Sequence, residues 1–166
     1  MPKKRNNTQG KGGARSAAAA SPWPGKGARI LYTIAALLAL IGLADATYLT
    51  ASHLAGETVT CIGVAGCSDV LSSSYAKVGP VPLAAFGVFA YLGAFSAAVC
   101  AGFGMARAHT VLLVAVGAMF LATLWLLYVQ AFVLHAFCSY CLLSAALTFA
   151  LSGIAIVAPP PASRGR

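Results

Sequence analysis

Two pairs of cysteines occupy positions from which thiols can exchange electrons. Cys61 and Cys67 are separated by five residues that include two glycines, and Cys138 and Cys141 form the motif C-S-Y-C. A thiolate attacks a disulfide through a mixed-disulfide intermediate, so two neighbouring pairs can pass two electrons from one to the other. The four cysteines therefore predict a thiol–disulfide relay.

The C-S-Y-C motif opens an apolar run, Phe137 to Ala158, that we predict to be a helix. Residues i and i+3 of a helix share a face, with Cβ atoms roughly 5–6 Å apart, close to the span of a disulfide. A helix N-terminus also stabilises a thiolate. This stabilisation should be greatest for Cys138, which lies nearer the end of the helix. His135 would either add positive charge nearby or only form hydrogen bonds at the membrane interface.

Two other interpretations of Cys61 and Cys67 are open. Oxidising compartments favour static disulfides, so the pair could form a structural disulfide that only cross-links its loop. A zinc site built from all four cysteines is the second alternative, but structural zinc sites typically have about two to four residues between paired ligands. Cys100 has no partner in the sequence and is expected to be a small apolar filler.

The elements that must position these thiols are membrane helices. The chain has 166 residues, 60% hydrophobic and 8% charged, whereas soluble domains are roughly 25% charged. Crossing a bilayer takes roughly 20 helical residues, and helices satisfy their own backbone hydrogen bonds in lipid. We predict an all-α membrane protein, a bundle of four transmembrane helices. Its spans are Ile30 to Ser52, Val81 to Phe103, Thr110 to Leu134 and Phe137 to Ala158.

The basic residues predict how the bundle is oriented. The net charge of +8 is concentrated before the first span and after the last, with Arg107 between the second and third spans. Basic loops stay in the cytoplasm, so both termini should be cytoplasmic and both cysteine pairs should lie on the outer face. We expect a disordered basic tail at 1–29, a membrane domain at 30–158 and a C-terminal tail at 159–166. A cleaved secretory signal is the alternative for the N-terminus, but its apolar run would be shorter.

The first outer loop is expected to form a short helical lid over the bundle. Ser68 is a suitable N-cap, and the charge of Asp69 would favour the positive end of the helix dipole. Val70, Leu71 and Tyr75 would pack inward, and at least one residue of Ser72 to Ser74 would face whatever the lid covers.

The sequence also makes predictions for an acid and two glycines within the spans. Asp45 lies in the first span, where an acid is either functional or merely hydrated near the interface. Gly87 and Gly93 in the second span are expected where helices approach closely.

Taken in order, these features resemble the bacterial vitamin K epoxide reductase family. The features are four helices, the C-x5-C pair, S-D-V-L-S-S-S-Y after it, P-V-P-L-A-A-F-G-V-F-A-Y opening the second helix, and Y-V-Q-A-F-V-L-H-A-F-C-S-Y-C-L-L-S-A between the third and fourth. The resemblance covers about Ile30 to Val157. Quinone-linked enzymes of the disulfide bond protein B type place C-x-x-C in the first outer loop, which is the reverse order.

The resemblance implies a role for each site residue. Cys141 would face a membrane quinone, of the menaquinone or ubiquinone type, and Cys138 would receive electrons from the loop. Cys67 would exchange with Cys138, and Cys61 would be attacked by the reduced substrate protein. Ser73 matches the serine that lies near the quinone ring.

The resemblance also predicts the reaction and the partner. Leu83 and Ala145 stand where the vertebrate enzymes have an asparagine and a tyrosine in the vitamin K pocket, which favours quinone reduction over epoxide reduction. The chain resembles the form without a fused thioredoxin domain, so its partner would be a separate thioredoxin-fold dithiol oxidase outside the cytoplasm. The expected location is the bacterial inner membrane. The alternatives are a non-enzymatic protein with a stapled loop, or an enzyme that exports reducing equivalents.

Overall fold

The structure is a computed structural model that describes residues 25–56, 70, 73, 76–78 and 81–161. Most of this part is helical, and two short strands pair antiparallel beside the helices. The elements are α1 (Lys26–Ala55), β1 (Lys77–Val78), β2 (Val81–Pro82), α3 (Leu83–Gly102), α4 (Ala106–Tyr128), the π-helix η2 (Val129–Val133) and α5 (Ser139–Val157). Four helical spans, with α4 and η2 forming one of them, are long and apolar enough to cross a membrane, which confirms the predicted fold class.

The ends of the helices differ from the predicted bounds in two informative places. α1 begins at Lys26, because lysine, alanine and arginine favour helix even where the sequence is not apolar. α5 begins at Ser139, so Cys138 precedes the helix as its N-cap and is not inside its first turn. The pairing of β1 with β2 was not predicted, because two-residue strands leave no periodic pattern in a sequence.

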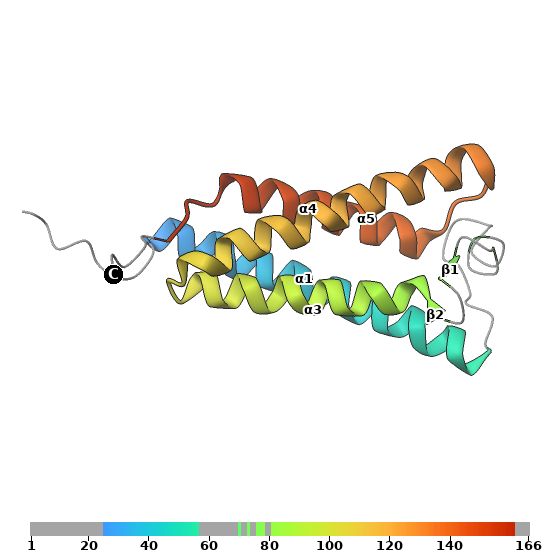
Figure 1. The fold of residues 1–166 in the computed structure, drawn as a ribbon, viewed down its shortest axis with the longest axis horizontal. Coiled ribbons are helices and arrows are strands. Elements are labelled where there is room, and N and C mark those ends of the chain that lie inside the picture. Colours follow the sequence, from blue (N-terminus) through green and yellow to red (C-terminus); the bar gives the residue numbers. More distant parts are fainter. Residues whose placement is uncertain (1–24, 57–69, 71–72, 74–75, 79–80, 162–166) are drawn as a thin grey trace, which may run out of the picture.

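The four helices form a closed ring. α1 contacts α3 and α5, and α4 contacts the same two helices from the other side. Figure 1 shows the start of α1 and the end of α5 at one end of the bundle, and β1, β2 and the start of α5 at the other. The bundle therefore has a terminal end and a strand end, and Cys138 lies at the strand end.

Small residues bring α1 and α3 close together. The buried face of α1 repeats every three or four residues and contains Ala28, Tyr32, Ala35, Ala39, Gly42, Ala46 and Leu49. α3 contributes Ala94, Ala97, Ala98 and Ala101 to the same core. Small side chains let helix backbones approach within a membrane, while large apolar side chains such as Phe89 and Ile156 remain exposed, as lipid-facing residues do.

Glycines confirm one predicted close approach and correct another. A Cβ at Gly87 would lie 3.4 Å from the Cβ of Ala46, so the prediction for Gly87 is confirmed. A Cβ at Gly93 would meet nothing within 4 Å, so the prediction for Gly93 was wrong. The tightest place is instead Gly42 of α1, where a Cβ would overlap the ring of Tyr91 on α3.

Buried tyrosines tie the helices together at two levels. At the terminal end, the Tyr32 hydroxyl is hydrogen-bonded to Nδ1 of His109 at 3.0 Å and donates to the Pro159 carbonyl at 3.0 Å. Nearer the strand end, the Tyr91 hydroxyl is hydrogen-bonded to Oγ of Ser144 at 2.8 Å and to Oγ1 of Thr148 at 3.2 Å. These bonds hold the helix ends and the centre of the bundle in fixed register.

Candidate active site

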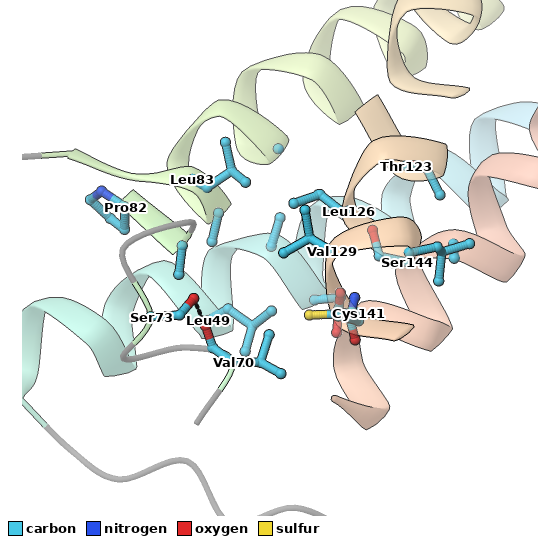
Figure 2. A pocket seen from close by; sticks show the side chains of 18 of the residues that line it. Leu49, Val70, Ser73, Pro82, Leu83, Thr123, Leu126, Val129, Cys141 and Ser144 are labelled. Carbon is cyan, nitrogen blue, oxygen red and sulfur yellow. Dashed lines mark hydrogen bonds between the residues drawn. The ribbon is translucent and has the colours of Figure 1, made fainter. Parts of the chain in front are cut away.

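A cavity of about 160 Å³ lies among the four helices toward the strand end. Its walls are mostly apolar, and every helix contributes to them (Figure 2). The lining consists of Asp45, Ala46, Leu49, His53, Val70, Ser73, Ala76, Pro82, Leu83, Ala84, Gly87, Tyr91, Thr123, Leu126, Leu127, Val129, Gln130, Leu134, Cys141, Ser144 and Ala145. An apolar cavity with a few polar groups is typical of a small-molecule site.

Cys141 and Cys138 have different surroundings. Cys141 is half-buried and lines the cavity, and Figure 2 shows its sulfur directed toward the side on which Leu49 and Val70 lie. Cys138 is fully buried and packs against Val70. Both are free thiols in this structure. The pair thus has one sulfur at the cavity and one behind it.

The start of α5 places the two sulfurs next to each other. As the N-cap residue, Cys138 accepts a hydrogen bond through Sγ from the backbone N–H of Cys141 at 3.4 Å. An N-cap side chain ordinarily satisfies the N–H two or three residues ahead, and here the cap is a thiol. The prediction that positions i and i+3 bring the pair together is confirmed by this contact.

The same arrangement lowers the pKa of Cys138 from its ordinary value of 9.0 to about 7. The largest cause is the hydrogen bond that the Cys141 side chain donates to the Cys138 sulfur, and the N–H groups of Cys141 and Tyr140 act in the same direction. Burial and the negative charge of Asp45 oppose the change. A low thiol pKa makes a cysteine reactive near neutral pH.

Gln130 fixes the position of Cys138 from the other side. The buried Gln130 side chain accepts the backbone N–H of Cys138 through Oε1 at 3.1 Å. The π-helix η2 brings Gln130 to this point, since π-turns re-aim side chains inside helices, often at functional sites. The chain then turns at His135, an exposed residue with a φ of 49°. No sequence pattern predicted this contact.

Ser73 and Asp45 also reach the cavity. Ser73 is half-buried, and its hydroxyl donates to the Val70 carbonyl at 2.7 Å, the dashed line in Figure 2. Asp45 is 9% exposed, which shows that it is not merely hydrated at the interface. Oδ2 of Asp45 is buried and has no hydrogen-bond partner among the described residues. Two of the residues singled out by the sequence therefore meet Cys141 at one cavity.

Comparison with protein families identifies this arrangement. A family model described as the vitamin K epoxide reductase family matches residues 33–156, which include the whole cavity and both cysteines of C-S-Y-C. The chain belongs to the vitamin K epoxide reductase family. It is thus a membrane thiol oxidoreductase, of a family that is linked to quinones and works with thioredoxin-like partners.

The structure of this vitamin K epoxide reductase family member describes some of the predicted site residues, and others lie outside the described part. Leu83 and Ala145 both line the cavity. Val70 is helical and buried, in agreement with its predicted inward packing. Cys61 and Cys67 lie outside the described residues, as do Ser68, Asp69, Leu71, Ser72, Ser74 and Tyr75 of the predicted lid.

Proposed function

We propose that this protein oxidises a thioredoxin-fold dithiol partner outside the cytoplasm and passes two electrons to a membrane quinone, so that it supports disulfide bond formation. The observation that carries the proposal is the unequal placement of the C-S-Y-C pair. Cys141 lines an apolar cavity, while Cys138 lies behind it with a pKa lowered to about 7. One sulfur is suited to a lipid-soluble acceptor, and the other to thiol exchange.

The cavity chemistry suits a quinone. A quinone has a flat apolar ring, which fits walls formed mainly by leucine, alanine and valine side chains. Its two carbonyl oxygens accept hydrogen bonds, and Asp45, Ser73 and Cys141 are polar groups at these walls. The cavity also opens among membrane-spanning helices, where such a molecule would be dissolved. When bound, the quinone supplies an acceptor for two electrons and two protons.

The order of transfer is the one that the resemblance to the family implies. The reduced partner attacks Cys61, and the Cys61–Cys67 disulfide is reduced as the partner becomes oxidised. Cys67 then attacks Cys138 in the Cys138–Cys141 disulfide, and Cys141 leaves as the thiolate. Each exchange breaks one S–S bond and forms another through a mixed disulfide. Cys61 finally attacks Cys67 in the mixed disulfide, which re-forms the Cys61–Cys67 bond and releases Cys138 as a thiolate. The lowered pKa of Cys138 makes it a good leaving group in this step.

The orientation is part of the proposal. Lys26, Arg29 and Arg107 are at the starts of α1 and α4, and both helix starts lie at the terminal end of the bundle (Figure 1). Basic residues favour the cytoplasmic side. The terminal end would thus face the cytoplasm, and the strand end, toward which the cavity lies, would face outward in a bacterial inner membrane.

Purified protein in liposomes tests the proposed function. Reduced thioredoxin-fold partner and either ubiquinone or menaquinone would be added, and quinone absorbance would be followed. Wild-type protein should reduce one of the two quinones, and Cys141→Ala should abolish that reduction. Cys100→Ala is the matched control, since this free cysteine lies near the far end of α3 and does not line the cavity. Quinone reduction that survives in Cys141→Ala would disprove the assignment.

A trapping experiment tests the order of the sulfurs. In Cys138→Ala the loop pair has no disulfide to reduce, so reduced partner should leave Cys61 and Cys67 as thiols. Alkylation followed by mass measurement reports this state. Rapid reoxidation of the loop pair by quinone in that variant would contradict the proposed relay.

A further inference from the structure

The carboxyl of Asp45 holds a buried oxygen atom at the cavity, Oδ2, that has no hydrogen-bond partner among the described residues. Three other polar side chains of the lining are already bonded within the protein. The Ser73 hydroxyl donates to Val70, the Tyr91 hydroxyl is bonded to Ser144, and Oε1 of Gln130 accepts from Cys138.

An unpartnered acid in such a place is costly. Burying a carboxylate without hydrogen bonds or a counter-charge is strongly unfavourable, and protonation relieves much of that cost. A buried polar group that lacks a partner calls for an explanation such as a catalytic role or a bound ligand. In a membrane span, an acid facing an internal cavity is a functional candidate for the same reason.

Asp45 lies close enough to the redox-active pair to act on it. When Asp45 is deprotonated, its negative charge raises the pKa of Cys138. Asp45 and Cys141 line the same cavity from α1 and α5. A proton held on Asp45 is therefore next to the space in which Cys141 would meet an electron acceptor.

The face of α1 that carries Asp45 also reaches the end of the helix. Leu49 and His53 follow Asp45 at intervals of four residues and line the same cavity. His53 is half-buried in the last turn of α1, about 12 Å from Asp45 along the axis at 1.5 Å per residue. The other titratable groups that face Asp45 across the cavity are Cys141 of α5 and Tyr91 of α3, and none of the described lining residues of α4 or η2 is titratable.

We propose that Asp45 is a catalytic proton donor, which delivers a proton to a carbonyl oxygen of the quinone as Cys138 and Cys141 are oxidised. This rests on the proposed function. In the step, the S–S bond forms between Cys138 and Cys141, and the two thiols lose two electrons and two protons. The quinone gains two electrons and two protons and becomes a quinol. Asp45 gives up one proton, takes one from the thiols, and ends unchanged.

Ser73 is a weaker source of that proton. Its hydroxyl hydrogen is held by the Val70 carbonyl at 2.7 Å, so donation to a quinone would first require that bond to break. A serine hydroxyl also remains protonated in water, whereas a carboxylic acid releases its proton readily. Ser73 can still contact the ring, while Asp45 supplies the proton.

The test compares Asp45→Asn with wild-type protein in two half-reactions. Asparagine keeps the size and hydrogen-bonding capacity of the side chain but cannot transfer a proton. Reduction of the Cys138–Cys141 disulfide by the partner, followed by thiol alkylation, should be unchanged. Quinone reduction should fall about 100-fold, the scale of general acid catalysis. Thr47→Ala is the matched control on α1, because Thr47 is exposed and its hydroxyl donates to the Leu43 carbonyl of the same helix.

An infrared measurement gives a readout independent of turnover. Reduced-minus-oxidised difference spectra in the presence of quinone should contain the C=O band of a protonated carboxylic acid, shifted in heavy water and absent from Asp45→Asn. In Asp45→Ala, small carboxylic acids such as formic acid should restore quinone reduction in proportion to their concentration. Asp45→Glu should retain more activity than Asp45→Asn.

The outcomes separate this inference from the proposed function. Quinone reduction by Asp45→Asn at the wild-type rate, or an acid band that persists in this variant, would overturn the role of Asp45 and leave the relay intact. Failure of wild-type protein to reduce any quinone would overturn both. Thermal unfolding distinguishes a folding defect, because loss of an unpartnered buried acid should leave Asp45→Asn at least as stable as wild type. A destabilised Asp45→Asn together with an inactive Asp45→Glu that formic acid fails to rescue would assign Asp45 a structural role instead.

Discussion

The side-chain oxygen of Gln130 accepts a hydrogen bond from the backbone N–H of Cys138 at 3.1 Å. This bond joins the π-helical end of one membrane span to the residue that begins the next. The carbonyl of Gln130 also accepts the N–H of Ala136 at 3.2 Å, so the same residue secures both ends of the connection. Gln130 thereby positions the cysteine whose sulfur caps α5.

Gln130→Leu should destabilise the protein, because it leaves the buried N–H of Cys138 without an acceptor. The expected loss is about 1–3 kcal/mol in the free energy of unfolding, measured by thermal unfolding in detergent. Hydrogen exchange of the segment around Cys138 should become faster. Phe132→Leu, at a highly exposed position of the same π-helix, serves as the control. Equal stability and exchange in Gln130→Leu and wild type would show that this bond does not hold the site.

Periodicity and spacing predict most of the fold but not this contact. Long apolar runs specify the four spans, and the i, i+3 spacing specifies that Cys138 and Cys141 meet. The contact between Gln130 and Cys138 depends on the π-turn and on the positive φ of His135, which arise from tertiary packing. Cys138 was expected inside the helix because the apolar run begins at Phe137. Cysteine is also not among the usual N-cap residues. Its role as N-cap therefore emerges only in three dimensions.

The cavity was predictable in part. Asp45 could be flagged because an acid in an apolar run is unusual, but the sequence leaves open whether it is hydrated or buried. The prediction for Gly93 was wrong for a different reason. When nearly all residues of a helix are apolar, the sequence does not reveal which face of the helix meets a neighbour. α3 is apolar on all sides, so the packing of the neighbouring helices determines which of its faces is buried.

The thiol of Cys138 should titrate with a midpoint near pH 7. A thiol is charged above its pKa, so lowering the pKa from 9.0 to about 7 makes it roughly half thiolate at neutral pH. The same sign makes the reduced fold gain stability as pH rises from about 7 to 9. Thiolate ultraviolet absorbance measures the titration in a variant whose Cys61, Cys67 and Cys100 are replaced by serine.

Cys141→Ala in that background tests the cause of the lowered pKa. It removes the side-chain hydrogen bond that contributes most to the shift, so the midpoint should move back toward 9.0. Cys138→Ala identifies the signal, because the transition near pH 7 should disappear. A midpoint that stays near 7 after Cys141→Ala would assign the shift to the backbone N–H groups alone.

Gly42→Ala should weaken the contact between α1 and α3. The added Cβ would overlap the Tyr91 ring, so the ring or the helix must move. Overpacking of this kind costs about 1–3 kcal/mol, and thermal unfolding measures it. Gly93→Ala is the matched control, because its Cβ would meet nothing within 4 Å. Similar melting temperatures for the two variants would show that the bundle accommodates the methyl group.

Tyr32→Phe should lower stability without slowing the redox reaction. The hydroxyl is bonded to His109 and Pro159 at the terminal end, far from the cavity lining. Loss of these bonds should cost about 1 kcal/mol, seen as a lower melting temperature. Quinone reduction per folded molecule should match wild type. A slower reaction with unchanged stability would mean that the two ends of the bundle are coupled.

Ala145→Phe should block the cavity while leaving the cysteine pair able to exchange thiols. Ala145 is buried and lines the cavity one turn beyond Cys141, so a phenyl ring there would occupy space that a quinone needs. The KM for quinone should rise or turnover should stop, whereas partner-driven reduction of Cys138–Cys141 should persist. Ala146→Phe is the control, because the neighbouring side chain is exposed on the outside of α5. If Ala145→Phe and Ala146→Phe reduced quinone equally well, the acceptor would have to reach Cys141 by a route other than this cavity.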